Sequence, residues 1–319
     1  MGRMENRRNY YAIPSVSKPK TPRPPDRSPR QARTPKRPQP EKATSHSSER
    51  TIRIAGLPAV TALFKRDPDR VLRFFYEERM VPLVGEFCAR MARFRRPYRM
   101  ADAEELARIA GTVLHGGIVA VAEPRTIPRF DPAEAHRWAR SGQPLFVLDG
   151  IGNSHNLGAI ARTLAFFGFQ NLVISDHPTQ AGLSESAYRV AEGGLEYLQI
   201  HRAASLPDTL RRLRSDYRVV GTALGRGVPM ETLAQDPRPV AVVLGNEEEG
   251  LPAATLAACE AVVTLRGSGQ VQSLNVSATT AILAYALRPQ PDAGRPVRRT
   301  NTPGRKPGNA GIPKSRPVK

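Results

Sequence analysis

The feature that most constrains the fold of this chain is the alternation of short apolar runs with helix-like segments over residues 145–287. The apolar runs, such as LFVLD and VAVVLG, are rich in Val and Leu and are bounded by turn-forming residues, which is typical of buried strands. Strands that alternate with helices in this way favour a parallel sheet with crossover helices. We expect strands at 145–149, 171–175, 197–200, 218–223, 240–245 and 261–265, and helices at 157–167, 184–191, 206–215, 251–258 and 274–287.

A smaller α/β region is expected before this sheet, in residues 51–124. It contains the strand-like runs VLRFFY and GGIVAVA, separated by helix-like segments that include AEELARIA. Residues 125–143 are interrupted by prolines and hold one short helical pattern, DPAEAHRWAR, so we interpret them as a linker. The chain is therefore expected to have a small α/β domain at 51–124 and a parallel-sheet α/β domain at 144–287.

The net charge of +19 is concentrated outside these two regions. Residues 1–50 carry 13 Lys and Arg against 4 Asp and Glu, residues 288–319 carry 9 against 1, and the two segments hold 16 of the 30 prolines. Such a composition buries too little apolar surface to offset the entropy of ordering, so both segments are predicted to be disordered basic arms. Basic arms attract polyanions by counterion release, and nucleic acid is the most common polyanion in a cytosol. A purely solubilising role for the arms stays open.

A cluster of arginines in the small region is a second candidate for contact with nucleic acid. Arg93, Arg95, Arg96 and Arg99 lie close together in the sequence, and guanidinium groups can bind phosphates through two parallel hydrogen bonds. The solvated face of an amphipathic helix would have the same composition. The sequence alone does not separate these two interpretations.

Several classes of protein are excluded by residue types and spacings. Cys88 and Cys259 lie far apart without the spacing of metal ligands, and the six histidines occur singly, so we expect no disulfide framework and no metal site. No apolar run approaches the roughly 20 residues that span a bilayer. The first residues, MGRMENRRNYYAIP, lack the apolar segment of a signal peptide. We therefore expect a cytoplasmic protein without a membrane partner.

The loops after three of the predicted strands contain glycine but match no common nucleotide motif. DGIGNSHNLG lacks the third glycine of a dinucleotide fingerprint, and GNEEEGLP continues with Leu-Pro where a phosphate-binding loop needs Lys and Ser or Thr. No G-x-S-x-G nucleophile motif is present either. Ligands bind at the carboxyl ends of strands in open parallel sheets, and the remaining polar residues suit orientation of a substrate rather than covalent catalysis. They are Asn156, Arg162, Glu247, Ser273 and Asn275.

The three loop segments together resemble a known family. FVLDGIGNSHNLGAIARTLAFFG, VAVVLGNEEEGL and VTLRGSGQVQSLNVSATTAIL are similar, in this order, to motifs 1, 2 and 3 of the SpoU (TrmH-like) RNA 2′-O-ribose methyltransferases. The preceding region, from RIAGLPAVTALF to AGTVLHGGIVAVAEP, resembles the small L30e-like domain that often precedes the catalytic domain in this family and binds the RNA substrate. With its basic N-terminal extension, the chain looks most like a little-characterised tRNA/rRNA methyltransferase branch of the family.

The resemblance implies an α/β catalytic domain with a C-terminal trefoil knot, a rare exception to unknotted topology. It implies S-adenosyl-L-methionine as the cofactor, bound in the knot mainly through backbone groups, and a homodimer formed by the catalytic domain. It also implies methyl transfer to a ribose 2′-hydroxyl of structured rRNA or tRNA, with the four clustered arginines assigned to RNA binding. The expected cofactor contacts are Gly245, Leu265 and Leu274, together with Thr222 and Ala223.

By the same resemblance, Arg162 is the residue expected to contribute most to catalysis. A guanidinium with a pKa above about 12 is a poor base, so we expect it to clamp a substrate phosphate and to stabilise the developing alkoxide. Asn156 is expected to shape the site, Glu247 to orient neighbouring donors, and Ser273 and Asn275 to hold the third loop and the cofactor. Capping of the last helix is the alternative role for Ser273 and Asn275.

Two departures from the family pattern bear on cofactor affinity. Glu248 stands where the second motif usually has glycine, which removes a residue that tolerates a positive φ. Arg266 and Gly267 stand where the third motif usually has Pro-Met, which we expect to loosen a turn beside the cofactor. These departures keep open a second hypothesis, a catalytically weak relative that binds RNA as an assembly factor. A third hypothesis is non-specific binding of DNA through the basic arms.

Overall fold

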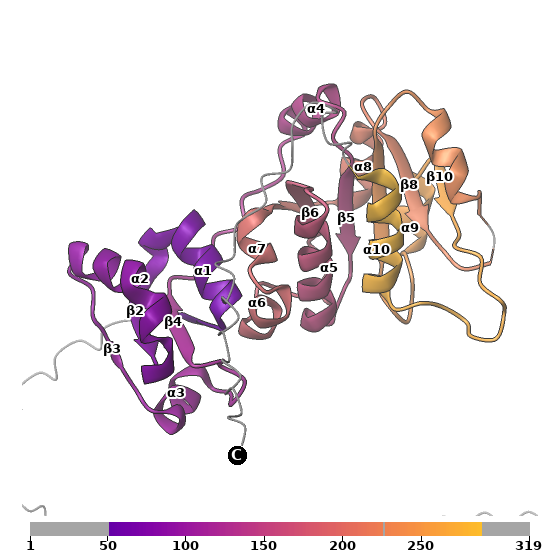
Figure 1. Ribbon diagram of the computed structural model, residues 1–319. Helices are drawn as coiled ribbons and strands as arrows, with labels where there is room; N and C mark the ends of the chain where they lie inside the picture. Colours follow the sequence, from indigo (N-terminus) through magenta and orange to yellow (C-terminus); the bar gives the residue numbers. More distant parts are fainter. Residues whose placement is uncertain (1–50, 226, 289–319) are drawn as a thin grey trace, which may run out of the picture. The chain divides into compact units, whose positions relative to one another are not determined.

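The structure is a computed structural model that describes residues 51–225 and 227–288 (Figure 1). The predicted basic arms at 1–50 and 288–319 lie outside the described residues, apart from Arg288. Two α/β regions follow each other along the described chain, the first built on a four-stranded sheet and the second on a six-stranded sheet. We refer to them as the small domain and the large domain.

The large domain is built on a parallel sheet. The strand order is β10-β8-β9-β5-β6-β7, and every pair of neighbours is parallel. Helices cover both faces, so β5, β6 and β9 are buried at every residue and appear in the sequence as continuous apolar runs. The strands are β5 (Leu145–Asp149), β6 (Asn171–Ser175), β7 (Gln199–Ala203), β8 (Arg218–Thr222), β9 (Val240–Gly245) and β10 (Ala261–Val263).

Two groups of helices cover the opposite faces of this sheet. Phe146 and Leu148 of β5 belong to the core on one face, whereas Leu145 and Val147 belong to the core on the other, as the two-residue period of a strand requires. The first face carries α5 (Ser154–Phe166), α6 (Glu185–Ala191), α7 (Gly194–Tyr197) and α10 (Val276–Leu287), and the second carries α4 (Pro132–Arg140), α8 (Leu206–Leu213) and α9 (Ala253–Ala258).

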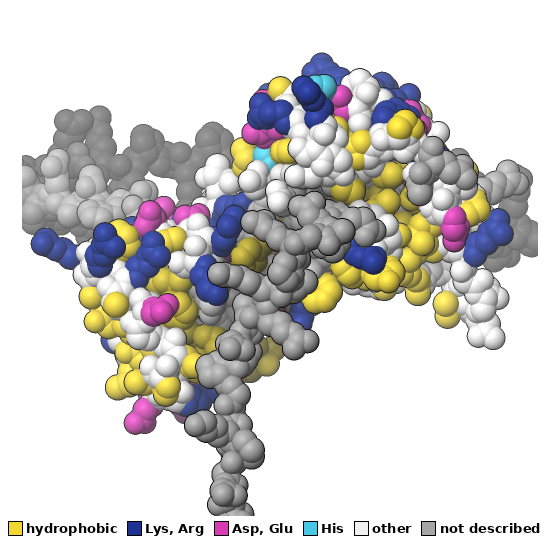
Figure 2. All heavy atoms as spheres, turned by 45° about the horizontal axis from the view of Figure 1, so that its top comes forward, with side chains coloured by type: hydrophobic (Ala, Val, Ile, Leu, Met, Phe, Trp, Pro, Cys, Tyr) yellow, Lys and Arg dark blue, Asp and Glu magenta, His cyan; other side chains and the backbone are white. Residues whose placement is uncertain are grey.

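Apolar side chains remain exposed on two of these helices. Phe166 of α5 is 82% exposed, and Ile282 and Tyr285 of α10 are 38% and 59% exposed. The two helices pack side by side (Figure 1), and Figure 2 shows hydrophobic side chains gathered on an exposed part of the large domain. A protein rarely leaves a large apolar patch in water unless the patch binds a partner.

The small domain has the strand order β1-β4-β2-β3, with β4 antiparallel to both of its neighbours and β3 parallel to β2. Helices α1 and α2 pack on one face of this sheet, and α3 packs on the other. The elements are β1 (Ile52–Ala55), α1 (Leu57–Arg66), β2 (Val71–Tyr76), α2 (Val81–Arg93), β3 (Tyr98–Met100), α3 (Ala103–Ala110) and β4 (Ile118–Ala122). The apolar core on the α1 face continues into the core beneath α5 and α6 of the large domain.

A buried ion pair joins the two domains. Arg70, which follows α1, donates from Nη1 to both carboxylate oxygens of Glu196 in α7 at 3.1 and 3.3 Å. The two side chains are only 9% and 2% exposed. Arg70 also donates to the backbone oxygen of Glu123 at 2.9 Å and to the hydroxyl of Tyr188 at 3.3 Å. These bonds satisfy a charged group that water does not reach.

Most of the expected elements are confirmed, with ends that differ by about three residues or fewer. The strand expected at 197–200 lies two to three residues later in the structure, because Tyr197 ends α7 and β7 begins at Gln199. β7 extends over the polar residue His201, whose ring lies 5.2 Å from that of Trp138. Strands β1 and β3 were not expected from the sequence, since each is very short.

The segment interpreted as a linker, residues 125–143, is packed rather than free. Helix α4 covers the second face of the large sheet, and Phe130 is 8% exposed. The backbone N–H of Phe130 donates to the carbonyl of Arg202 at 2.8 Å. Arg125 donates to the carbonyls of Leu195 and Leu198, both at 2.7 Å.

Candidate active site

The central strands of the large sheet bring three loops to one edge. β5 and β9 are adjacent and in register, with Leu148 opposite Leu244 and Asp149 opposite Gly245. The loops that follow these strands therefore begin side by side. The third loop, residues 264–275, leads from β10 to α10, and α10 packs against α5, the helix that follows the first loop (Figure 1).

Hydrogen bonds between side chains join the three loops. Asn156, in the first turn of α5, donates from Nδ2 to Oε1 of Glu247 at 2.6 Å. Asn275 donates from Nδ2 to Oδ1 of Asn156 at 3.1 Å. The Oδ1 atom of Asn275 also accepts from the backbone N–H of Ser277 at 2.8 Å and caps α10. Asn275 therefore caps α10, which was the alternative role expected for it. The cap uses Oδ1 only, so Nδ2 of Asn275 can donate to Asn156.

The loop after β9 is folded as a tight turn. Asn246 and Gly250 exchange two backbone hydrogen bonds of 3.0 Å, and the Asn246 side chain donates to the carbonyl of Gly150 in the first loop at 2.8 Å. Its Oδ1 atom accepts from the backbone N–H groups of Glu248 and Glu249 at 2.9 and 3.1 Å. The positive φ of this turn, 74°, falls on Gly250 and not on Glu248. The backbone therefore does not require a glycine at position 248.

Gly245 cannot be replaced without moving the turn after β9. A Cβ atom at this position would lie 2.4 Å from the carbonyl carbon of Gly250 and 2.6 Å from the backbone nitrogen of Leu251. Contacts this short with backbone atoms are forbidden, so the close approach of two backbone segments explains the glycine.

The residues expected to hold the cofactor lie at or near the ends of neighbouring strands. Thr222 ends β8 and is followed by Ala223. Gly245 ends β9, and Leu265 follows β10. Leu274, in the third loop, is 50% exposed. S-adenosylmethionine combines an adenine ring with a short methionine chain, and such a ligand needs apolar contacts with a few polar backbone groups. Strand ends with an uncovered leucine nearby fit these needs.

Arg162 and Ser273 are not part of the hydrogen-bonded chain formed by the other three predicted residues. The guanidinium Nη2 of Arg162 lies 2.9 Å from Oε2 of Glu192, which follows α6, and the two side chains are 57% and 47% exposed. Ser273 lies in the third loop and is exposed. The structure thus brings together Asn156, Glu247 and Asn275 and leaves Arg162 on a different part of α5. Glu192 was not predicted, and no sequence motif distinguishes it.

The four arginines assigned to RNA binding differ in their surroundings. Arg96 donates to the carbonyls of Asp69 and Val71 at 2.6 and 2.5 Å. Arg99 is paired with Glu105. Arg93 and Arg95 are exposed, and within the described residues their side chains make no hydrogen bond or ion pair. Of these four arginines, Arg93 and Arg95 therefore have side chains without a partner among the described residues.

In the described part of the chain, no group of three or more His, Cys, Asp and Glu side chains could hold a metal ion, and no helix is long and apolar enough to cross a membrane. Burial raises the pKa of the Cys259 thiol to about 11. This thiol is protonated at neutral pH and is a poor nucleophile.

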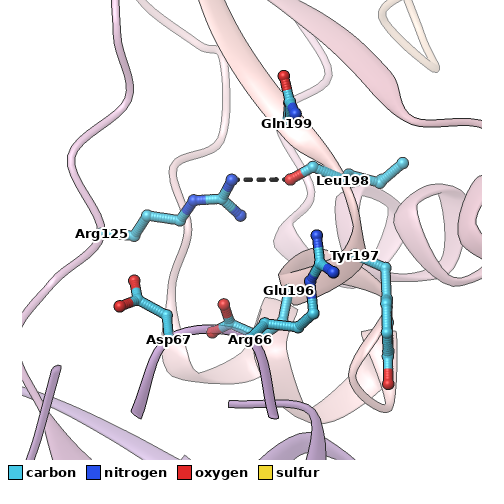
Figure 3. Close-up of a pocket in the computed structure, with 7 residues that line it drawn as sticks. All are labelled: Arg66, Asp67, Arg125, Glu196, Tyr197, Leu198 and Gln199. Carbon is cyan, nitrogen blue, oxygen red and sulfur yellow. Dashed lines mark hydrogen bonds between the residues drawn. The ribbon is translucent and has the colours of Figure 1, made fainter. Parts of the chain in front are cut away.

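A cavity of about 160 Å³ lies where the two domains meet (Figure 3). Arg125 crosses it and donates to the carbonyl of Leu198 (Figure 3). Its other lining residues are Arg66, Asp67, Glu196, Tyr197 and Gln199. None of the residues predicted for catalysis or cofactor binding lines it, so we assign this cavity to the contact between the domains.

Comparison with known proteins identifies the family. Residues 143–285 match the model of the SpoU rRNA Methylase family, and residues 53–128 match the model for RNA 2′-O ribose methyltransferase substrate binding. The chain is 32% identical over 250 residues to an uncharacterized tRNA/rRNA methyltransferase of Escherichia coli O157:H7, YfiF, in an alignment that covers 76% of this chain and 69% of the relative. The chain belongs to the SpoU family.

Other SpoU proteins cover the same two domains. RlmB of Shewanella oneidensis, a 23S rRNA (guanosine-2′-O-)-methyltransferase, is 30% identical over 240 residues, which are 73% of this chain and 94% of RlmB. An AdoMet-bound rRNA methyltransferase from Sinorhizobium meliloti has the same fold, with a TM-score of 0.63 at 23% identity over 75% of this chain and 87% of that one. The predicted family and the predicted α/β fold class are confirmed.

Proposed function

We propose that this SpoU protein transfers the methyl group of S-adenosylmethionine to a ribose 2′-hydroxyl of a structured rRNA or tRNA in the cytoplasm. The observation that carries the proposal is the hydrogen-bonded chain of Glu247, Asn156 and Asn275, which links the three family motifs at the carboxyl edge of a parallel sheet. RlmB, which shares both domains, is named for the same reaction on 23S rRNA.

The cofactor would supply a methyl group on a sulfonium. Attack by the ribose oxygen would form the new C–O bond while the C–S bond breaks, S-adenosylhomocysteine would leave, and the hydroxyl proton would pass to water. The protein would contribute by positioning the ribose hydroxyl and by stabilising the negative charge that develops on it. A 2′-hydroxyl is a poor nucleophile and needs in-line geometry, and Asn156, held between Glu247 and Asn275, provides a fixed polar group in the site. Arg162 would bind the phosphate beside the target ribose and stabilise the developing alkoxide.

The cofactor would be held by Thr222, Ala223, Gly245, Leu265 and Leu274. The first three lie where β8 and β9 end. The N–H of Ala223 donates to the carbonyl of Val263 at 3.3 Å and its carbonyl accepts from Oγ1 of Thr264 at 2.9 Å, so this backbone is held in place beside the proposed cofactor. The leucines would supply apolar contacts for adenine, and Ser273 would hold the third loop over the cofactor. The fit rests on the position of these residues at or beside the ends of β8, β9 and β10.

RNA recognition would rest on the small domain and the basic segments. Arg93 and Arg95 would contact phosphates, because both guanidinium groups are exposed. Arg96 and Arg99 have partners within the domain and would add mainly to the local positive potential. The segments 1–50 and 288–319 would raise affinity without choosing the nucleotide.

The large domain would form a homodimer through α5 and α10. The exposed apolar side chains of Phe166, Ile282 and Tyr285 on these helices support this assembly. Sedimentation of wild type and of the Phe166→Glu variant tests it, since a buried charge at the interface should release monomers. The trefoil knot of the C-terminal segment stays a prediction.

The activity is tested by transfer of a tritiated methyl group to total RNA from a strain that lacks the gene, with binding of S-adenosylmethionine measured by calorimetry. We expect label in ribose. Arg162→Ala should lower kcat by about 10²-fold or more, the effect of removing one charge-stabilising donor. RNA affinity should change far less, because the other arginines remain. Arg162→Lys, which keeps the charge but loses the bidentate geometry, is the matched control.

A second candidate function is RNA binding without catalysis, and the presence of Arg266 beside the proposed cofactor site favours it. In that case S-adenosylmethionine would not bind, and Arg162→Ala would change nothing measurable. Equal competition by RNA and DNA at physiological salt would instead indicate non-specific binding through the basic segments.

A further inference from the structure

The ion pair between Arg162 and Glu192 is unexpected at a residue proposed to bind RNA. The Nη2 and Oε2 atoms are 2.9 Å apart, and each side chain is about half exposed. A carboxylate presents two oxygens to a guanidinium in much the same way as a phosphate does. Glu192 therefore occupies the part of Arg162 that an RNA phosphate would use.

The backbone around Glu192 is constrained. Glu192 adopts left-handed angles of φ 45° and ψ 43°, which are unfavourable for a residue with a side chain. The residue that follows, Gly193, has φ 93°, and a Cβ atom there would lie 2.8 Å from Cβ of Ala62 and 2.9 Å from the carbonyl oxygen of Pro58, both in α1 of the small domain. Unfavourable backbone angles persist only where the surroundings enforce them.

The next glycine fixes the same turn against Arg162 itself. A Cβ atom at Gly194 would lie 2.8 Å from Cα of Arg162 and 2.8 Å from the carbonyl oxygen of Ala161. The turn of residues 192–194 is thus held between α1 on one side and α5 on the other. Its backbone keeps the Glu192 carboxylate within reach of the guanidinium.

We infer that Glu192 is a positioning residue, an internal carboxylate that holds the Arg162 guanidinium in the RNA-free enzyme and is displaced by a phosphate of the bound RNA. Half-exposed ion pairs are weak because water and salt screen them, so a polyanion held at many other contacts can displace the carboxylate. A guanidinium pairs with phosphate in a bidentate geometry. The inference rests on the proposed function, in which Arg162 binds a substrate phosphate.

If an RNA phosphate displaces the Glu192 carboxylate from Arg162, removing the charge of Glu192 should strengthen RNA binding. Affinity is measured by fluorescence anisotropy with a labelled RNA hairpin and without S-adenosylmethionine. Glu192→Gln should lower Kd by about two- to fivefold, the size that corresponds to an exposed ion pair. In turnover assays, the gain should appear in KM rather than in a loss of kcat.

Glu185→Gln is the matched control, because Glu185 begins α6, the helix that Glu192 follows, is also partly exposed and is paired with a different arginine, Arg53. It removes the same charge, so the effect at Glu192 must exceed it. In the Arg162→Ala background, the effect of Glu192→Gln should fall to that of the control. Glu192→Ala should reproduce the effect of Glu192→Gln, and thermal unfolding confirms that each variant is folded.

Two results would contradict the displacement of the Glu192 carboxylate by an RNA phosphate. One is an unchanged Kd for Glu192→Gln, and the other is a tighter Kd that persists in the Arg162→Ala background. A lower kcat at constant KM would also contradict this displacement, since Glu192 would then hold Arg162 in its productive orientation. Kd is measured without turnover, so it tests the displacement of Glu192 by RNA independently of catalysis. If wild-type protein methylates no RNA, the proposed function fails even when Glu192→Gln tightens RNA binding.

Discussion

Replacement of Glu196 by alanine should destabilise the protein by about 3–5 kcal/mol, the cost of leaving one member of a buried ion pair without its partner. Arg70 would keep the carbonyl of Glu123 and the hydroxyl of Tyr188 as acceptors, and Nη1 would keep the half-exposed carboxylate of Asp67, whose Oδ2 lies 3.7 Å away. These remaining partners lead us to expect the lower end of this range. For a unit of this size, about 3 kcal/mol corresponds to a fall in Tm of about 6–12 °C.

Urea and thermal unfolding followed by circular dichroism measure this effect. The double variant Arg70→Met, Glu196→Leu should be less destabilised than Glu196→Ala, because it removes both charges and restores apolar packing. Glu104→Ala is the control, since the Glu104 side chain is 91% exposed and its pair with Arg108 is worth at most about 0.5 kcal/mol. A loss below about 1 kcal/mol for Glu196→Ala, or single-variant effects at Arg70 and Glu196 that simply add, would refute the reasoning.

Three further predictions concern other parts of the molecule. Gly245→Ala should cost about 1–3 kcal/mol of stability through overpacking and should weaken binding of S-adenosylmethionine in calorimetry; unchanged affinity would place the cofactor elsewhere. Joint replacement of Arg93 and Arg95 by Ala should lower RNA affinity and reduce the salt slope by about 2, whereas Arg99→Ala should have a smaller effect because Arg99 is paired with Glu105. Hydrogen bonds from Arg238 lower the pKa of Asp236 from 3.8 to about 2. The ionised Asp236 carboxylate therefore stabilises the folded state fully above pH 3.8, and this stabilisation is lost as the pH falls through about 2. Asp236→Asn should remove this part of the pH dependence of Tm, and an unaltered profile would contradict the assignment.

The order of strands and helices in the large domain could be predicted because its strands are continuous apolar runs separated by helical patterns. The runs at 145–149, 171–175 and 240–245 match β5, β6 and β9, since both faces of these strands are buried. The end of β7 was not predicted, because its polar residue His201 is buried against aromatic rings that come from another segment. Contacts of this kind depend on tertiary structure and leave no local pattern.

The candidate site could be predicted only in part. Motif positions identified Asn156, Glu247 and Asn275, and the structure brings these three residues into one hydrogen-bonded chain. The partner of Arg162 could not be predicted, because Glu192 reaches it through a turn whose shape depends on packing against α1. The exchange of backbone hydrogen bonds between Asn246 and Gly250 likewise explains why glutamate is acceptable at position 248, which the sequence pattern did not indicate.

The position of Asn275 at the start of α10 has a consequence for how the enzyme is made. The ribosome synthesises the small domain and β5 to β10 before it reaches the third loop, so a nascent chain contains Asn156 and Glu247 before Asn275 is added. Until α10 docks against α5, the amide oxygen of Asn156 lacks its donor. The hydrogen-bonded chain that joins the three loops is therefore complete only after α10 has been synthesised and has docked against α5.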